Sequence, residues 1–279
     1  MRRGIGFGLF VAVAGVTLAF LALPIVGIFV HTSPGKLLDQ FSNPAVKDAL
    51  VVSLKTSLIA QALIILFGTP TAYLLATRRF PGHSLAVTLV ELPLVLPPAV
   101  AGIGLLTALG RQGLLGSSLS AFGVRLPFTQ TAVTVAVAYV ASPLYIRQAM
   151  ATFEETDPHL TAASRTLGAG PLRTFFRIVL PLARGGLIAG LALSFARGLG
   201  EFGATIMFAG SLQGVTQTLP LAIYQEFDMQ PDGFTTALAM SGVLVLISAA
   251  LLLTLRIGLS WQRSPSTKSR SLFGLSGSA

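Results

Sequence analysis

The sequence predicts an all-α membrane protein with about six transmembrane helices, and three observations support this prediction. Hydrophobic residues make up 53% of the 279 residues and charged residues only 10%, whereas a soluble domain carries about 25% charged residues. Several uncharged runs are long enough to cross a bilayer, which takes about 20 residues in a helix. The 19 lysines and arginines fall mainly in alternate loops. A soluble enzyme, a disordered chain and a fibrous protein are therefore excluded.

Each predicted span is an apolar run between more polar segments. The six spans cover residues 4–30, 56–77, 85–109, 126–146, a segment that begins at 185, and 233–255. The first run exceeds the apolar core of a secretory signal, about 7–15 residues, so we expect it to be retained. Pro93, Pro97 and Pro98 interrupt the third span and predict a bent helix. Residues 202–225 are uncharged but rich in polar side chains and glycine, which predicts a re-entrant or interfacial segment.

The net charge of +9 predicts the orientation of these spans. On a soluble protein it would suggest nucleic acid, but on a membrane protein it reports basic loops on one face. With six spans, thirteen of the 19 lysines and arginines fall on one side, which is therefore cytoplasmic and holds both termini. Residues 1–261 are expected to form a single transmembrane domain. The Ser- and Gly-rich residues 262–279 are expected to form a disordered tail.

The longest cytoplasmic loop, about residues 147–184, is predicted to contain two short helices. Asp157 and Pro158 are typical of a helix start, Gly168 and Gly170 of its end, and Pro171 of a second start. Pro181 is expected to break the chain before the fifth span. An apolar and basic hairpin of this kind either rests on lipid headgroups or docks a cytoplasmic partner.

The spacing within this loop resembles a known family. Ala162, Ala163 and Ser164 are followed by three residues and Gly168, and then by nine residues and Ile178-Val179-Leu180-Pro181. Membrane subunits of binding-protein-dependent ABC importers carry a similar loop, written E-A-A, three residues, G, nine residues, I-x-L-P. The acidic first position of that pattern is Ala162 here. The resemblance implies an ABC importer permease fold and a cytoplasmic ATPase subunit that docks on this loop.

Two further segments resemble the molybdate and sulfate permease subunits of that family. They are Gly200 to Ile206, reading GEFGATI, and Leu92 to Gly102, reading LPLVLPPAVAG. Residues 216–224, TQTLPLAIY, are more similar to the molybdate branch. The resemblance extends over about residues 49–255. It implies a permease subunit of an ATP-driven molybdate importer that works by alternating access. The implied partners are a second copy of the chain, an ABC ATPase, an extracytoplasmic molybdate-binding protein and membrane lipid.

The chain contains no phosphate-binding loop of the form G-x-x-x-x-G-K-[ST], so ATP and Mg are expected on the separate ATPase subunit. The residues expected to couple the permease to that subunit are Ala162, Ala163, Ser164, Arg165, Gly168, Phe175, Phe176, Ile178, Leu180 and Pro181. Phe175 and Phe176 are candidates for interface anchors, because buried aromatic residues dominate interface energetics. The alternative places both rings in the membrane interface. The arginines of the loop either pair with acids on the ATPase or only mark the inner face.

Arg197 and Glu201 are the charges of the fifth span, and their i, i+4 spacing places them on one helix face. Charges in the membrane are costly, so they pair or line an aqueous path. A glutamate repels a dianion, so Glu201 is interpreted as a gate or structural partner of Arg197 or of backbone amides. The alternative is a charge at the water boundary. The full set of predicted pathway or gate residues is Arg197, Gly200, Glu201, Gly203, Thr205, Gln217 and Thr218.

Other functions remain as alternatives. A sulfate or tungstate permease is the nearest one. An ion-driven secondary transporter would need intramembrane acids as ion sites, for which Glu91 and Glu201 are the candidates. An intramembrane enzyme would need a catalytic constellation, and no such pattern or metal-ligand cluster is visible in the sequence.

Overall fold

The structure is a computed structural model that describes residues 2–40, 42–229 and 233–262, and every regular element in these ranges is a helix. The helices are α1 (Arg2–His31), α2 (Pro34–Gln40), α3 (Pro44–Thr77), α4 (His83–Val95), α5 (Pro98–Leu109), α6 (Gly116–Ala121), α7 (Gln130–Glu154), α8 (Pro158–Thr166), α9 (Pro171–Thr174), the π-helical turn η1 (Phe175–Val179), α10 (Leu180–Leu199), α11 (Gly203–Ala209), α12 (Leu219–Met229) and α13 (Gly233–Gln262). The predicted tail lies outside the described residues from 263 onward.

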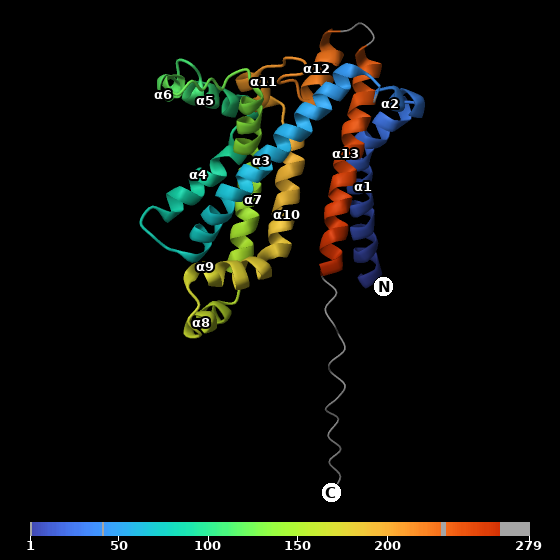
Figure 1. Ribbon diagram of the computed structural model, residues 1–279. Helices are drawn as coiled ribbons and strands as arrows, with labels where there is room; N and C mark the ends of the chain where they lie inside the picture. Colours follow the sequence, from blue (N-terminus) through green and yellow to red (C-terminus); the bar gives the residue numbers. More distant parts are fainter. Residues whose placement is uncertain (1, 41, 230–232, 263–279) are drawn as a thin grey trace.

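Four described helical segments are long and apolar enough to cross a membrane, namely residues 7–31, 44–77, 171–199 and 233–254. The pair α4 and α5 would make a fifth, but it bends by 118°. The bend lies between Val95 and Pro98, at the prolines where the sequence predicts it. Helix α7 does not pass this test of apolarity, although it runs beside α3 and α10 (Figure 1). The all-helical membrane fold is thus confirmed, and the count of six spans stays a prediction.

The buried core is formed mainly by α3, α7 and α10, with residues of α5 and α11 packed against α7. Small residues bring α10 close to its neighbours. A methyl group at Gly186 would lie 1.9 Å from Thr152 Oγ1 of α7, and one at Gly198 would lie 2.9 Å from Val137 Cγ1. Small residues recur every fourth position along this face of α10, at Gly186, Gly190, Ser194 and Gly198. Helix α10 therefore packs through its backbone, and little room is left for added side-chain volume.

Two expectations about helix boundaries are wrong. Helix α3 begins at Pro44, well before residue 56, because Asn43 caps it by accepting a hydrogen bond from the Ala45 N–H at 3.0 Å. Pro181 does not break the chain: residues 171–199 form one uninterrupted helical segment. The π turn places a hydrogen bond from the Leu180 N–H to the Phe175 carbonyl just before the proline. The segment changes direction there, since α9 runs across the lower end of Figure 1 while α10 runs upward.

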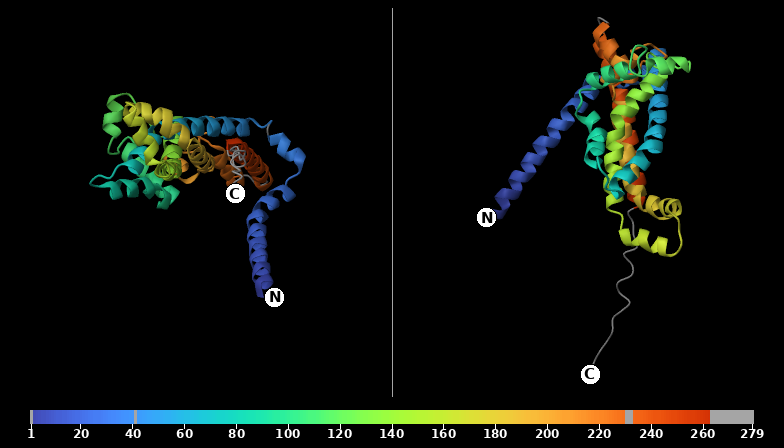
Figure 2. Two further views of the ribbon diagram at one scale, coloured as in Figure 1. Left: turned by 90° about the horizontal axis from the view of Figure 1, so that it is seen from below. Right: turned by 90° about the vertical axis from the view of Figure 1, so that its left-hand side faces the viewer.

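Helix α1 stands apart from the rest of the chain. None of its most apolar window is buried. Figure 2 shows its N-terminal part diverging from the bundle, and its contact with α13 lies near its other end, where Ile28 and Phe29 approach Gly242. The first residue of α1 and the last of α13 lie at the same end of the molecule as α8 and α9 (Figure 1). The cytoplasmic location of both termini stays a prediction.

Candidate functional site

The loop between α7 and α10 folds as the predicted helical hairpin. Asp157 caps α8 by accepting a hydrogen bond from the His159 N–H at 2.8 Å. At the other end Gly168 has φ +83°. Its N–H donates to the Arg165 carbonyl at 2.9 Å, and the next N–H donates to the Ser164 carbonyl at 3.1 Å. This pair of bonds is a Schellman motif, which needs a residue in the left-handed conformation and so favours glycine.

A buried hydrogen bond joins the two helices of the hairpin. Ser164 Oγ on α8 lies 3.0 Å from Thr174 Oγ1 on α9, and both side chains are buried. Ser164 occupies the third position of the motif quoted above, where a small side chain lets the helices approach. The hydroxyl pair thus fixes how α8 lies against α9.

The hairpin is attached to the bundle by aromatic rings. Phe175 lies 4.8 Å from the ring of Tyr73 on α3 and 6.2 Å from the ring of Phe153 on α7, measured between centroids. Tyr73 and Phe153 meet edge-to-face at 5.4 Å. Phe175 is therefore half-buried and packs on the bundle, and its role as an anchor for a partner stays a prediction. Phe176, in contrast, is 60% exposed.

The outer surface of the hairpin is apolar and basic. Leu167 and Leu172 are 88% and 74% exposed, and the sequence patterns did not single them out. Of the predicted coupling residues, Ala162, Ala163, Arg165, Gly168 and Pro181 are exposed, while Ile178 and Leu180 are partly buried. The hairpin borders an open pocket of about 670 Å³ against the ends of α3 and α7. Exposed Leu167, Leu172 and Phe176, together with the loop arginines, form a surface suited to a protein partner.

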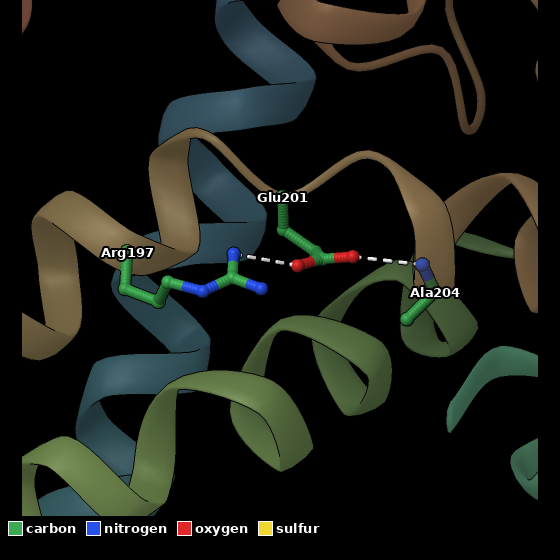
Figure 3. A network of polar contacts seen from close by, with 3 residues as sticks. All are labelled: Arg197, Glu201 and Ala204. Atoms are coloured by element: carbon green, nitrogen blue, oxygen red, sulfur yellow. Dashed lines mark hydrogen bonds and ion pairs between the residues drawn. The ribbon is translucent and has the colours of Figure 1, made fainter. Parts of the chain in front are cut away.

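At the opposite end of α10, Arg197 and Glu201 form an ion pair (Figure 3). Arg197 Nη1 lies 2.7 Å from Glu201 Oε2, and Glu201 Oε1 accepts a hydrogen bond from the Ala204 N–H at 2.7 Å. The Glu201 side chain is only 1% exposed and that of Arg197 is 33% exposed. The carboxylate therefore joins the end of α10 to the start of α11 and is not a charge at the water boundary.

Of the other predicted pathway residues, three are buried and two are glycines at the junction between α10 and α11. Thr205, Gln217 and Thr218 are buried, and Gln217 Nε2 donates to Gln225 Oε1 at 2.6 Å. Gly203 lies against α5, where a methyl group would come 2.7 Å from Pro98 Cβ, and Gly200 is exposed. The structure thus groups Gly200, Glu201 and Gly203 at the α10–α11 junction. Contact of the three buried side chains with an ion stays a prediction.

Sequence reasoning missed polar contacts between helices. Gln61 on α3 accepts a hydrogen bond from Ser194 Oγ at 2.7 Å, and both side chains are buried. Glu91 on α4 forms an ion pair with Arg147 on α7, with 3.2 Å between Oε1 and Nε. A lone Gln within the uncharged run at 56–77 is a signal that could have pointed to the first contact. Each intramembrane acid proposed for a secondary transporter, Glu91 and Glu201, is paired with an arginine.

Comparisons with known proteins agree on the family. The family model for "Binding-protein-dependent transport system inner membrane component" matches residues 64–258. The molybdenum transport system permease protein ModB of Mycobacterium tuberculosis is 39% identical over 242 residues, covering 87% of this chain and 90% of the relative. The Escherichia coli K12 protein of the same name is 44% identical over 63% of this chain and 78% of the relative. The sulfate transport system permease protein CysT of Salmonella typhimurium is 37% identical over 78% of each chain.

Solved structures show the same fold at low sequence identity. A chain of a bacterial alginate ABC transporter in complex with its alginate-bound periplasmic protein superposes with a TM-score of 0.70. It is 16% identical, and the match covers 94% of this chain and 96% of that chain. A chain of the inward-facing MetNI methionine ABC transporter gives a TM-score of 0.55 at 17% identity, covering 77% and 92%.

Proposed function

The chain belongs to the binding-protein-dependent transport system inner membrane component family, and from this premise we propose that it is the permease subunit of an ATP-driven molybdate importer. The observation that carries the proposal is the relationship to molybdenum permeases over nearly the full length of both chains. The second candidate is a sulfate permease, favoured by the 37% identity to a sulfate permease over 78% of the chain.

Transport by this family separates the membrane path from ATP hydrolysis. The sequence contains no phosphate-binding loop of the Walker A type, which supports an ATPase on another chain. ATP and Mg bind to that subunit in our proposal. A second copy of this chain completes the path, and an extracytoplasmic binding protein delivers molybdate to its outer side. Substrate selection then depends mostly on the binding protein.

The hairpin is the element that receives force from the ATPase. Its exposed Leu167, Leu172 and Phe176 contact the ATPase in our proposal, while Phe175 transfers the movement to α3 and α7. The hairpin also continues without interruption into α10, whose far end holds Arg197 and Glu201. ATP binding draws two hairpins together and opens the path outward, and hydrolysis restores the inward-facing state. The junction at Glu201 lies where α10 passes its movement to α11.

The test is transport by the reconstituted complex. The permease is assembled in liposomes with an ABC ATPase and a molybdate-binding protein from the same organism, and uptake of radiolabelled molybdate is measured with and without internal ATP. We expect ATP-dependent uptake that tungstate competes with more strongly than sulfate does. Uptake that needs no ATPase would overturn the proposal in favour of an ion-driven carrier. Preferential uptake of sulfate would establish the second candidate.

A further inference from the structure

The open pocket beside the hairpin lies where two apolar helical segments end. Its volume of about 670 Å³ falls within the range of about 300–1,000 Å³ that is typical of ligand sites. Thr77 is the last residue of the segment 44–77, and Pro171 is the first residue of the segment 171–199. Both residues line the pocket. Because both segments are long and apolar enough to cross a membrane, the pocket lies at the boundary between a membrane and water.

The pocket also extends along α3 into its apolar segment. Pro70, Tyr73 and Ala76 belong to this wall. Pro70 lies seven residues before Thr77, where α3 ends, and this is about 10 Å along the helix axis at 1.5 Å per residue. The pocket therefore borders both the apolar part of α3 and its polar end. A ligand that fills it has an apolar portion and a polar portion.

Aromatic rings form the apolar part of the lining. Tyr73, Phe153, Phe175 and Phe176 all line the pocket. The first three contact one another, with 4.8 Å between the ring centroids of Tyr73 and Phe175. Tyrosine is enriched at the boundary between a membrane and water, where its ring lies at the level of the lipid head groups. The rings thus supply a rigid apolar surface at the level where a lipid changes from polar to apolar.

Two arginines and one glutamate supply the charges of the lining, which therefore carries a net charge of +1. Arg78 follows the end of α3, and Arg165 lies on α8. Within the described part of the chain, neither arginine side chain has an ion-pair or hydrogen-bond partner, and Glu154 pairs with neither of them. A guanidinium binds a phosphate group through two parallel hydrogen bonds. Two unpaired guanidinium groups beside an aromatic surface therefore suit a phosphate that carries an apolar chain.

We propose that this pocket binds an anionic phospholipid, whose phosphate contacts Arg78 and Arg165 and whose acyl chains follow α3 toward Pro70. Basic pockets between transmembrane helices bind anionic lipid head groups in the same way. A free phosphate ion would leave the aromatic lining uncovered. Because Arg78 follows α3 and Arg165 belongs to the hairpin, the bound lipid joins the hairpin to the bundle. Leu167, which is 88% exposed, lies outside the pocket lining and stays available to a protein partner.

Photolabelling of the assembled complex tests the site. The permease is assembled with an ABC ATPase from the same organism in phosphatidylcholine nanodiscs that contain a small fraction of photoreactive phosphatidylglycerol, and labelled peptides are identified by mass spectrometry. We expect label in peptides that contain residues 70–78 and 153–179. The double variant Arg78→Gln with Arg165→Gln should lower this labelling by about 5- to 30-fold, the effect of losing one or two basic contacts to an anionic lipid.

The matched control removes the same charge from outside the pocket. Arg79→Gln with Arg173→Gln changes one exposed arginine beside the end of α3 and one on α9, and neither lines the pocket. This double variant should keep most of the labelling. Equal loss in the two double variants would show that the arginines only mark the membrane boundary and would overturn the proposal. Unchanged labelling in the pocket variant would overturn it as well.

Competition in the unaltered complex needs no variant, so it tests the proposal even if the pocket variant fails to fold. Unlabelled phosphatidylglycerol should displace the label, whereas added phosphatidylcholine and inorganic phosphate should not. Displacement by inorganic phosphate would identify a site for a soluble anion, and equal displacement by both lipids would show a non-specific lipid contact. Labelling that appears only without the ATPase would show that the ATPase covers the pocket. Each of these three results would overturn the proposal, and none depends on the ion that the protein transports.

Discussion

Replacing Gly168 by alanine tests whether the shape of the hairpin couples the permease to its ATPase. Gly168 has φ +83°, and no atom lies within 4 Å of the position that a methyl group would take. The cost of alanine is therefore backbone strain without a clash. Holding an L-residue in the left-handed region costs about 1–2 kcal/mol. An asparagine at the same position should cost less, because it tolerates this conformation.

The strain acts on the hairpin alone. A cost of 1–2 kcal/mol shifts an equilibrium by about 5- to 30-fold, so the equilibrium constant for forming the two hydrogen bonds of the Schellman motif falls by that factor. We expect the affinity of the ATPase subunit for the permease to fall by up to the same factor. The thermal stability of the bundle should change little, since Gly168 packs against nothing.

The matched control is Gly170→Ala, two residues further on. Gly170 has φ −68° and likewise no atom near its added methyl group, so alanine is tolerated there. Binding of the purified ATPase to the permease in detergent and uptake by the reconstituted complex are measured for both variants. Equal affinities for the two variants would refute the reasoning, because only Gly168 needs the left-handed conformation.

Further predictions concern the bundle and its two ends. Gly186→Ala should destabilise the assembled permease by about 1–3 kcal/mol in thermal unfolding, since its methyl group would meet a hydroxyl of α7 at 1.9 Å, whereas Gly185→Ala should be neutral. Glu201→Gln should cost about 1.5–3 kcal/mol, the value of a hydrogen bond to a charged group, and unchanged unfolding would contradict the joining role. Phe175→Ala should cost about 3 kcal/mol and speed hydrogen exchange in the hairpin, while Phe176→Ala should lower only ATPase affinity. If Phe175→Ala lowered only ATPase affinity and Phe176→Ala lowered stability, Phe175 would be the anchor for the partner.

The membrane class and the hairpin could be predicted because both depend on local chemistry. Apolar length identifies a span, and Asp157, Gly168 and Pro171 specify helix ends through their own backbone preferences. Helix α3 begins earlier than predicted because its N-cap is Asn43, whereas the uncharged run begins only after Lys55. Pro181 was misjudged because the π turn before it alters the hydrogen-bond ladder, which no residue pattern used here signals.

The candidate site was harder to predict because it depends on contacts between distant parts of the chain. Phe175 and Phe176 are adjacent and identical in type, yet one packs on Tyr73 and the other is exposed. The Arg197–Glu201 pair was predictable because the two residues are one helical turn apart. The Glu91–Arg147 pair joins two helices, and only the packing of α4 on α7 brings its charges together.

In the proposed mechanism, the change of direction at the π turn lets α9 and η1 act on α10 as a short lever. Helix α9 and η1 lie across the hairpin end of the molecule, and α10 runs from there toward the opposite end (Figure 1). Helix α10 has 20 residues and is therefore about 30 Å long at 1.5 Å per residue. If a movement of α9 and η1 tilts α10 as a rigid body by about 6°, the end of α10 near Leu199 moves by about 3 Å. In the proposed mechanism Arg197 and Glu201 move together at the end of α10, so such a tilt changes only the 2.7 Å contact between Glu201 and the Ala204 N–H of α11.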